Sequence, residues 1–118
     1  MAKLLLVDDA MFMRAALKKV VEEAGHQVIA EAGTGAEAVE VYGSVNPDIV
    51  LMDITMPDMD GIEATKLIMG SHPEAKIIMV SAMGQMDMVV KAITAGAKDF
   101  VVKPVDNEKL KSCIRKYM

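Results

Sequence analysis

The chain has 118 residues, of which 53% are hydrophobic and only 3% aromatic, and its formal net charge is −4. This is the length of one ordinary domain with an aliphatic core. The absence of tryptophan and of any basic block argues against base stacking and phosphate-backbone binding, so we expect no nucleic-acid partner.

The N-terminal apolar run, "LLLV", is only four residues long before it meets two acids. It is too short for a signal peptide or a membrane span. The single cysteine, Cys113, excludes an internal disulfide. We therefore expect a cytoplasmic protein that makes no membrane contact.

Short apolar runs alternate with amphipathic segments along the whole chain. The runs are non-alternating and rich in Val, Ile and Leu, which is typical of strands covered on both faces. Strands are expected over 4–7, 28–30, 49–52, 77–80 and 100–102, and helices over 13–24, 35–43, 62–70, 86–93 and 110–117. This order predicts an α/β fold, with a parallel sheet between two helical layers.

Polar residues stand at the carboxyl ends of four expected strands: Asp8 and Asp9, Asp53, Ser81, and Lys103. Ligands of open parallel sheets bind outside these ends, where the strand order reverses. The five side chains are therefore expected to meet at one rim. Singly, each has an ordinary role as a turn residue, a helix cap or a solvated side chain; the functional hypothesis depends on their combination.

Three carboxylates in one pocket oppose one another's ionisation unless a cation neutralises them. Mg²⁺ prefers oxygen ligands, and no His or Cys is expected at this rim. A carboxylate beside the metal can attack phosphorus and form an acyl phosphate. Asp53 is the expected nucleophile, with Lys103 neutralising the phosphoryl oxygens and Ser81 donating a hydrogen bond.

The segments "LLLVDD", "DIVLMDITMPDMDG", "IIMVSA" and "KDFVVKP" together resemble the receiver domain of bacterial and archaeal response regulators. The resemblance covers essentially the whole chain, and implies one receiver domain over 1–118 without an output domain. It also implies a flavodoxin-like (βα)5 sandwich with strand order 2-1-3-4-5. A cis peptide bond is implied between Lys103 and Pro104.

The resemblance assigns the metal ligands more finely. Asp9, Asp53 and the backbone carbonyl of Thr55 would bind Mg²⁺ directly, and Asp8 would act mostly through water. Such a domain is not a turnover enzyme. It catalyses only its own phosphorylation and autodephosphorylation, with a lifetime tuned by positions such as Thr55 and Met83.

Among receivers, the motifs are most similar to single-domain chemotaxis regulators of non-enteric bacteria and archaea. The expected phosphodonor is a CheA-like histidine kinase. The expected target is a FliM-like flagellar switch protein or an archaeal adaptor, bound by a monomer, and a phosphatase would be a further partner. Phe100 stands at the aromatic switch position, and Val89, Val102 and Lys111 are expected partner contacts. A stand-alone receiver in another phosphorelay is the alternative.

Three other classes are weighed against the receiver hypothesis. A flavodoxin-like FMN binder needs a phosphate loop after the first strand, where "DDAMFM" would repel phosphate. A haloacid-dehalogenase-type phosphatase usually has a second aspartate two residues after its nucleophile, where this chain has Thr55. A phosphate-independent interaction module would have no need of the acceptor residues.

Overall fold

The computed structural model describes residues 1–118, in which five strands alternate with five helices. In chain order the elements are β1 (Lys3–Val7), α1 (Met11–Glu23), β2 (Gln27–Ala32), α2 (Gly35–Val45), β3 (Ile49–Met52), α3 (Gly61–Ser71), β4 (Ile77–Ser81), α4 (Met86–Ala95), β5 (Asp99–Val102) and α5 (Asn107–Tyr117). The predicted alternation is confirmed. None of the helices combines the length and the apolar character needed to cross a membrane.

The strands form one parallel sheet in the order β2-β1-β3-β4-β5. This confirms the fold class and the strand order implied by the resemblance to receivers. The chain builds outward from β1 in one direction to β2 and in the other to β3. The order therefore reverses between β1 and β3, and the rim beside their carboxyl ends is where such a sheet places its site.

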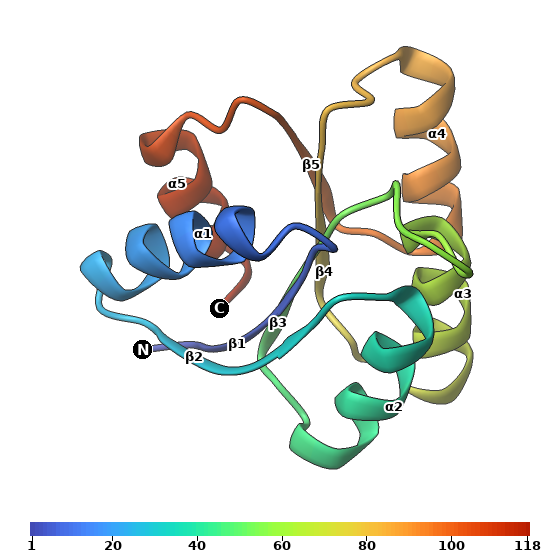
Figure 1. Ribbon diagram of the computed structural model, residues 1–118, viewed down its shortest axis with the longest axis horizontal. Helices are drawn as coiled ribbons and strands as arrows, with labels where there is room; N and C mark the ends of the chain where they lie inside the picture. The colour runs from blue at the N-terminus through green and yellow to red at the C-terminus, as the bar shows by residue number, and fades with distance from the viewer.

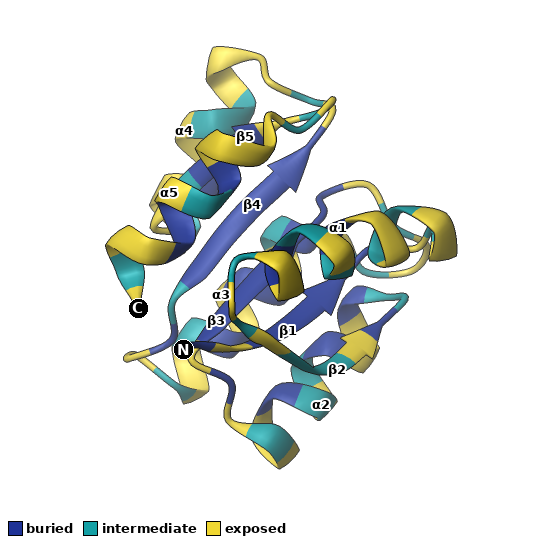
Figure 2. Ribbon diagram, turned by 90° about the vertical axis from the view of Figure 1, so that its left-hand side faces the viewer, coloured by how far each residue is buried: buried dark blue, intermediate teal, exposed yellow.

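Helices cover both faces of the sheet, with α1 and α5 on one side and α2, α3 and α4 on the other (Figure 1). The covering buries β3 and β4 completely and β1 after its first residue (Figure 2). The edge strands β2 and β5 keep exposed positions. The expectation of strands covered on both faces is thus wrong for parts of these two, because an edge strand has a neighbour on one side only.

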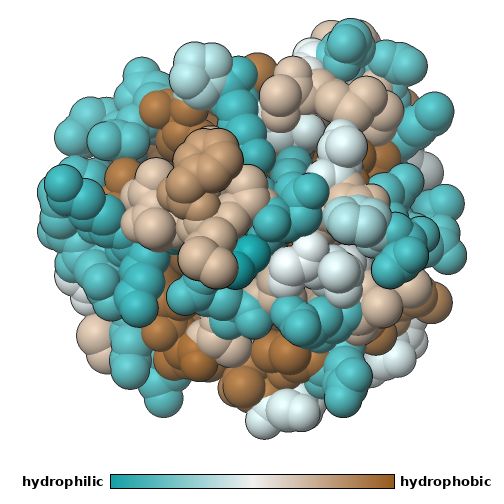
Figure 3. Space-filling model, in the orientation of Figure 1, coloured by the Kyte–Doolittle hydropathy of each residue, from teal (hydrophilic) through white to brown (hydrophobic).

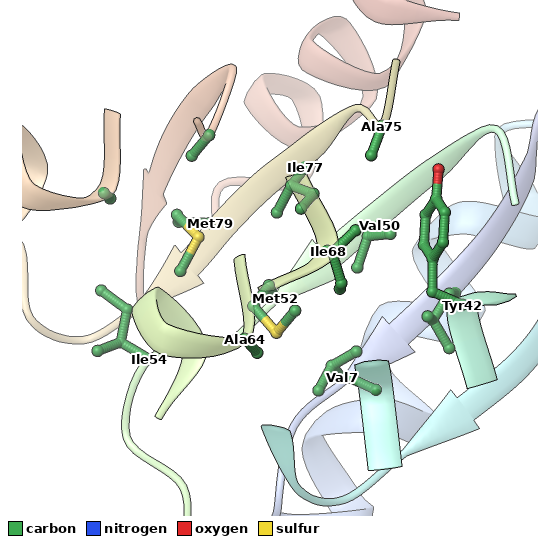
Figure 4. Packing of buried hydrophobic residues seen from close by; sticks show 14 of the residues in the cluster. Val7, Tyr42, Val50, Met52, Ile54, Ala64, Ile68, Ala75, Ile77 and Met79 are labelled. Atoms are coloured by element: carbon green, nitrogen blue, oxygen red, sulfur yellow. The ribbon is translucent and has the colours of Figure 1, made fainter. Parts of the chain in front are cut away.

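Each face of the sheet has its own core. Sixteen buried residues, among them Met52 and Ile68, pack between the sheet and α2–α4 (Figure 4). Thirteen more, among them Leu51 and Ile114, pack beneath α1 and α5. Consecutive strand residues point to opposite faces, so Leu51 and Met52 anchor β3 in both cores. The two cores are of similar size, so the sheet is packed on both faces up to the rim.

Three helices begin with a polar cap. The Thr34 hydroxyl accepts the Glu37 N–H at 3.1 Å, and the Glu37 carboxylate accepts the N–H of Gly33, the residue before the cap, at 2.9 Å, a variant of the capping box. Asp60 and Asp106 cap α3 and α5. Helices α1 and α4 have no side-chain cap, and both follow the rim directly. The turns that lead into them must therefore be held by other contacts.

Candidate functional site

The structure brings the five predicted rim residues together at the carboxyl edge of the sheet. Asp8 and Asp9 follow β1, Asp53 follows β3, Ser81 ends β4 and Lys103 follows β5. One carboxylate oxygen from each aspartate lies within 4.8 Å of the others. Residues separated by up to 95 positions in the chain are in contact here.

Asp53 is a buried carboxylate, with 6% of its surface exposed. Its Oδ1 accepts the N–H of Ile54 at 2.8 Å, and its Oδ2 lies 3.5 Å from Lys103 Nζ. Burial raises the pKa of the Asp53 carboxyl above its ordinary value, and the nearby Asp8 raises it further. Lys103 and the Ile54 N–H act in the opposite direction without cancelling the rise. The site thus holds a desolvated carboxylate with one oxygen fixed and the other facing the lysine.

Asp8 is the more tightly held neighbour, with 1% exposure. Its Oδ2 accepts a hydrogen bond from Lys103 Nζ at 2.7 Å, and its Oδ1 accepts the N–H of Ala10 at 2.9 Å. Lys103 therefore lies closer to Asp8 than to Asp53. Both Asp8 oxygens already have protein partners, which suits a ligand that acts through water better than one that binds a metal directly.

Asp9 differs from the other two aspartates in being exposed. None of the hydrogen bonds or ion pairs that hold Asp8 and Asp53 involves its carboxylate. Three clustered carboxylates without a His or Cys ligand fit a hard divalent cation such as Mg²⁺, which takes oxygen ligands and keeps several waters. Burial first and the charge of Asp8 second raise the pKa of Asp53, so Lys103 alone does not offset the cost of a negative charge at this position.

Ser81 and Thr55 are joined through Met83. The Ser81 hydroxyl oxygen is buried and accepts the Met83 N–H at 3.1 Å, so its proton stays free to donate. The Thr55 hydroxyl donates to the Met83 thioether sulfur at 3.2 Å. The sequence singled out both Thr55 and Met83, but not this contact between them. It links the loop after β3 to the loop after β4 across the rim.

The predicted switch and partner residues lie on α4, β5 and α5, and Val102 pairs in register with Ser81 at the rim. Phe100 is buried, with 8% exposure, and pairs in register with Met79 of β4. Val102 is 43% exposed, Val89 is half-buried on α4, and Lys111 lies on α5 with its Nζ 3.7 Å from Glu108. The structure thus holds the Phe100 side chain inward, in the core beneath α2–α4.

Exposed apolar side chains border the rim on two sides. Met11 and Phe12 open α1 after the acid pair and Ala10, and each is 75% exposed. Figure 3 shows apolar side chains gathered over this helix. Met86 at the start of α4 is 74% exposed. Apolar surface on both sides suits the docking of another protein over the rim.

One residue at the site was not predicted from the sequence. The guanidinium of Arg14 on α1 donates to the backbone carbonyl oxygen of Asp8, and its Nε pairs with Glu31 on β2 at 3.0 Å. Nothing in the helical pattern around Arg14 distinguishes it from a solvated arginine. Its partners come from two other elements and appear only in the folded chain.

The model of the response regulator receiver domain matches residues 4–115. The chemotaxis protein CheY of Listeria monocytogenes is 55% identical over 116 residues, which are 98% of each chain. That of Thermotoga maritima is 54% identical over 114 residues, 97% of this chain and 95% of the relative. A crystal structure of the CheX–CheY–BeF3–Mg²⁺ complex from Borrelia burgdorferi contains a similar chain, with a TM-score of 0.93 and 39% identity over 97% of this chain and 87% of that one.

The fold, the rim and these similarities define a receiver of a two-component system. The chain belongs to the response regulator receiver domain family, and within that family it is similar to chemotaxis CheY proteins. Membership of this family argues against the two enzyme and cofactor classes considered from the sequence, an FMN-binding protein and a haloacid-dehalogenase-type phosphatase.

Proposed function

We propose that this protein takes a phosphoryl group onto Asp53 from a CheA-like histidine kinase and signals by binding another protein. The observation that carries the proposal is the surroundings of Asp53. It is a buried carboxylate with Asp8 beside it, and its Oδ2 lies 3.5 Å from Lys103 at the rim of a receiver fold.

The two oxygens of Asp53 have different surroundings, which supports different roles for them. Oδ1 is held by the Ile54 N–H, which leaves Oδ2, on the side of Lys103, as the nucleophile. As the bond from Oδ2 to phosphorus forms, the bond from phosphorus to the donor nitrogen breaks, and its electron pair leaves with the donor. Lys103 neutralises the equatorial oxygens, and the free Ser81 proton donates to one of them.

Magnesium would be held by Asp9, Asp53 and the Thr55 carbonyl, with Asp8 contributing through water. When bound, the ion offsets the charge of the carboxylates and of the incoming phosphoryl group. Lys103 changes partner as phosphate arrives, because up to two new negative charges on Asp53 compete with Asp8 for the ammonium. Hydrolysis of the acyl phosphate releases inorganic phosphate and returns Asp53 to its starting state, so the chain catalyses only the phosphorylation and dephosphorylation of its own side chain.

The experiment that tests the phosphoacceptor role is incubation with acetyl phosphate, followed by intact mass spectrometry. One phosphoryl group per chain is expected with Mg²⁺ and none when the metal is chelated. The group should disappear after the donor is removed. Sustained hydrolysis of small phosphomonoesters would contradict the proposal, since it requires a phosphatase rather than a phosphoacceptor.

The proposed output surface is the α4–β5–α5 face, with Phe100 as its switch and Val89, Val102 and Lys111 as contacts. Its target is a FliM-like flagellar switch protein or an archaeal adaptor, and a phosphatase would terminate the signal. The similarity to chemotaxis CheY proteins supports this assignment. The close packing of the loop after β4 supports a coupling between Ser81 and this face, because a Cβ on Gly84 would lie 2.8 Å from the Val102 side chain. A movement of Ser81 toward phosphate would therefore change the packing around Val102.

Ser81→Ala is expected to accept phosphate at Asp53 and yet to lose most of the gain in partner affinity. The variant lacks the hydroxyl that pulls the loop toward the phosphoryl group, while the nucleophile is unchanged. Binding of FliM-derived or adaptor protein is measured with and without beryllofluoride and Mg²⁺. Ser71→Ala, an exposed serine at the end of α3, is the control and should behave as wild type. Equal beryllofluoride-dependent gains for Ser81→Ala and wild type would contradict the coupling.

A further inference from the structure

The turn between β1 and α1 is held by an unusual set of contacts. Asp8 donates its N–H to the carbonyl of Ala32 at 3.1 Å and accepts the Ala10 N–H on its own carboxylate. Its carbonyl oxygen accepts from the Nη1 of Arg14. The guanidinium is itself oriented by Glu31, whose carboxylate lies 3.0 Å from Nε. One arginine thus ties α1 to the ends of β1 and β2.

The carbonyl of Asp8 and the N–H of Asp9 belong to the same planar peptide group. By holding that carbonyl oxygen, Arg14 restricts the orientation of the Asp8–Asp9 peptide plane and so the backbone position of Asp9. This matters because α1 has no side-chain cap and the Asp9 carboxylate is exposed. Arg14 therefore holds the backbone from which the Asp9 side chain departs, and so narrows the directions that the Asp9 carboxylate can take.

We propose that Arg14 is a positioning residue for the magnesium site, holding the Asp8–Asp9 peptide so that Asp9 points at the ion. The inference rests on the proposed function, because it takes Asp9 to be a metal ligand. Arg14 would not touch the ion. Its contribution is to restrict Asp9 before the metal arrives, as partners outside the ligand shell do at other metal sites.

Electrostatics and positioning predict opposite changes in Mg²⁺ affinity when Arg14 is removed. A guanidinium against the backbone of Asp8 places positive charge near three carboxylates and opposes the binding of a divalent cation. If charge were all that mattered, Arg14→Ala would bind Mg²⁺ more tightly. Positioning predicts weaker binding, by about tenfold or more. The sign of the change therefore separates the two explanations.

The test is the Kd for Mg²⁺ by isothermal titration calorimetry, with the backbone amide shifts of Asp9 and Ala10 followed by NMR. Arg14→Ala and Arg14→Lys are compared with wild type, and Asp9→Ala serves as the ligand deletion. Lysine keeps the charge but lacks the fork that reaches both Glu31 and the carbonyl, so its affinity should lie between wild type and Arg14→Ala. Arg115→Ala, the same change at an exposed arginine of α5, should leave the Kd unchanged.

Thermal unfolding without Mg²⁺ identifies variants that are folded at the titration temperature. A merely structural role would lower the Tm of Arg14→Ala without changing its Kd. Binding by folded Arg14→Ala as tight as wild type, or tighter, would overturn the inference. If that variant does not fold, Arg14→Lys is judged by the same criterion. Absence of Mg²⁺ binding by wild type would instead overturn the proposed metal site, and the inference with it.

Discussion

Gly61→Ala is expected to lower the free energy of unfolding by at least about 3 kcal/mol, the upper range for overpacking. A Cβ at this position would lie 1.8 Å from the carbonyl oxygen of Asp53 and 3.0 Å from the Cα of Ile54. Both neighbours are backbone, so no side-chain rotation relieves the clash. The Gly61 N–H also donates to the Ile54 carbonyl at 2.8 Å, which fixes the approach. The displaced backbone is that of the proposed phosphoacceptor, so phosphorylation should slow as well.

Gly70→Ala in the same helix is the control. A Cβ there meets nothing within 4 Å, and alanine is favoured over glycine in a helix by about 1 kcal/mol. Chemical denaturation should therefore show opposite signs for the two substitutions. Equal stability of Gly61→Ala and wild type would mean that the backbone around Asp53 is far softer than its packing indicates.

Asp53→Asn is expected to be more stable than wild type at neutral pH by about 1 kcal/mol, a rise in Tm of about 4 °C. Because burial and Asp8 raise the folded-state pKa of Asp53, the fold favours its neutral form. The stability that this carboxyl contributes is present below its unfolded pKa, about 4, and is lost as the pH rises through the folded pKa. Asparagine keeps the shape without the charge and so avoids that loss.

The difference between Asp53→Asn and wild type should shrink toward zero as the pH is lowered below about 4, where the wild-type carboxyl is also neutral. Added Mg²⁺ should stabilise wild type more than the variant, because the proposed metal site uses the carboxylate that the variant lacks. Asp58→Asn in the adjacent exposed loop controls for the loss of one negative charge. A variant less stable than wild type at pH 7 would show that Lys103 outweighs the cost of burying Asp53.

The sequence predicts the fold well because its signals are local and consistent. Apolar runs such as 49–52 coincide with β3, and Gly96, the left-handed residue after α4, marks the end of that helix. The ends of a strand are less predictable where they depend on a pairing strand that is distant in the sequence. β2 extends to 27–32 beyond the apolar run at 28–30, because pairing with β1 recruits Gln27 and Glu31. The exposed positions of β2 and β5 follow from their places at the sheet edges, which the apolar runs do not encode.

At the site, the sequence predicts which residues meet but not how they share partners. Lys103 was expected to face the phosphoryl group, and the structure pairs it first with Asp8. The inward position of Phe100 depends on packing against β4 and cannot be read from its own neighbours in the chain. Arg14 is the clearest case, because its function depends on a carbonyl oxygen, which any residue could have supplied.

The most direct test of the central claim is to trap the phosphorylated protein with borohydride and map the product by peptide mass spectrometry. Borohydride reduces an acyl phosphate of aspartate to homoserine and leaves a phosphoserine intact. After treatment with acetyl phosphate and Mg²⁺, homoserine is expected at position 53 and at no other aspartate. Homoserine at position 8 or 9, or an unreduced phosphate on Ser81, would contradict the assignment of Asp53 as the phosphoacceptor.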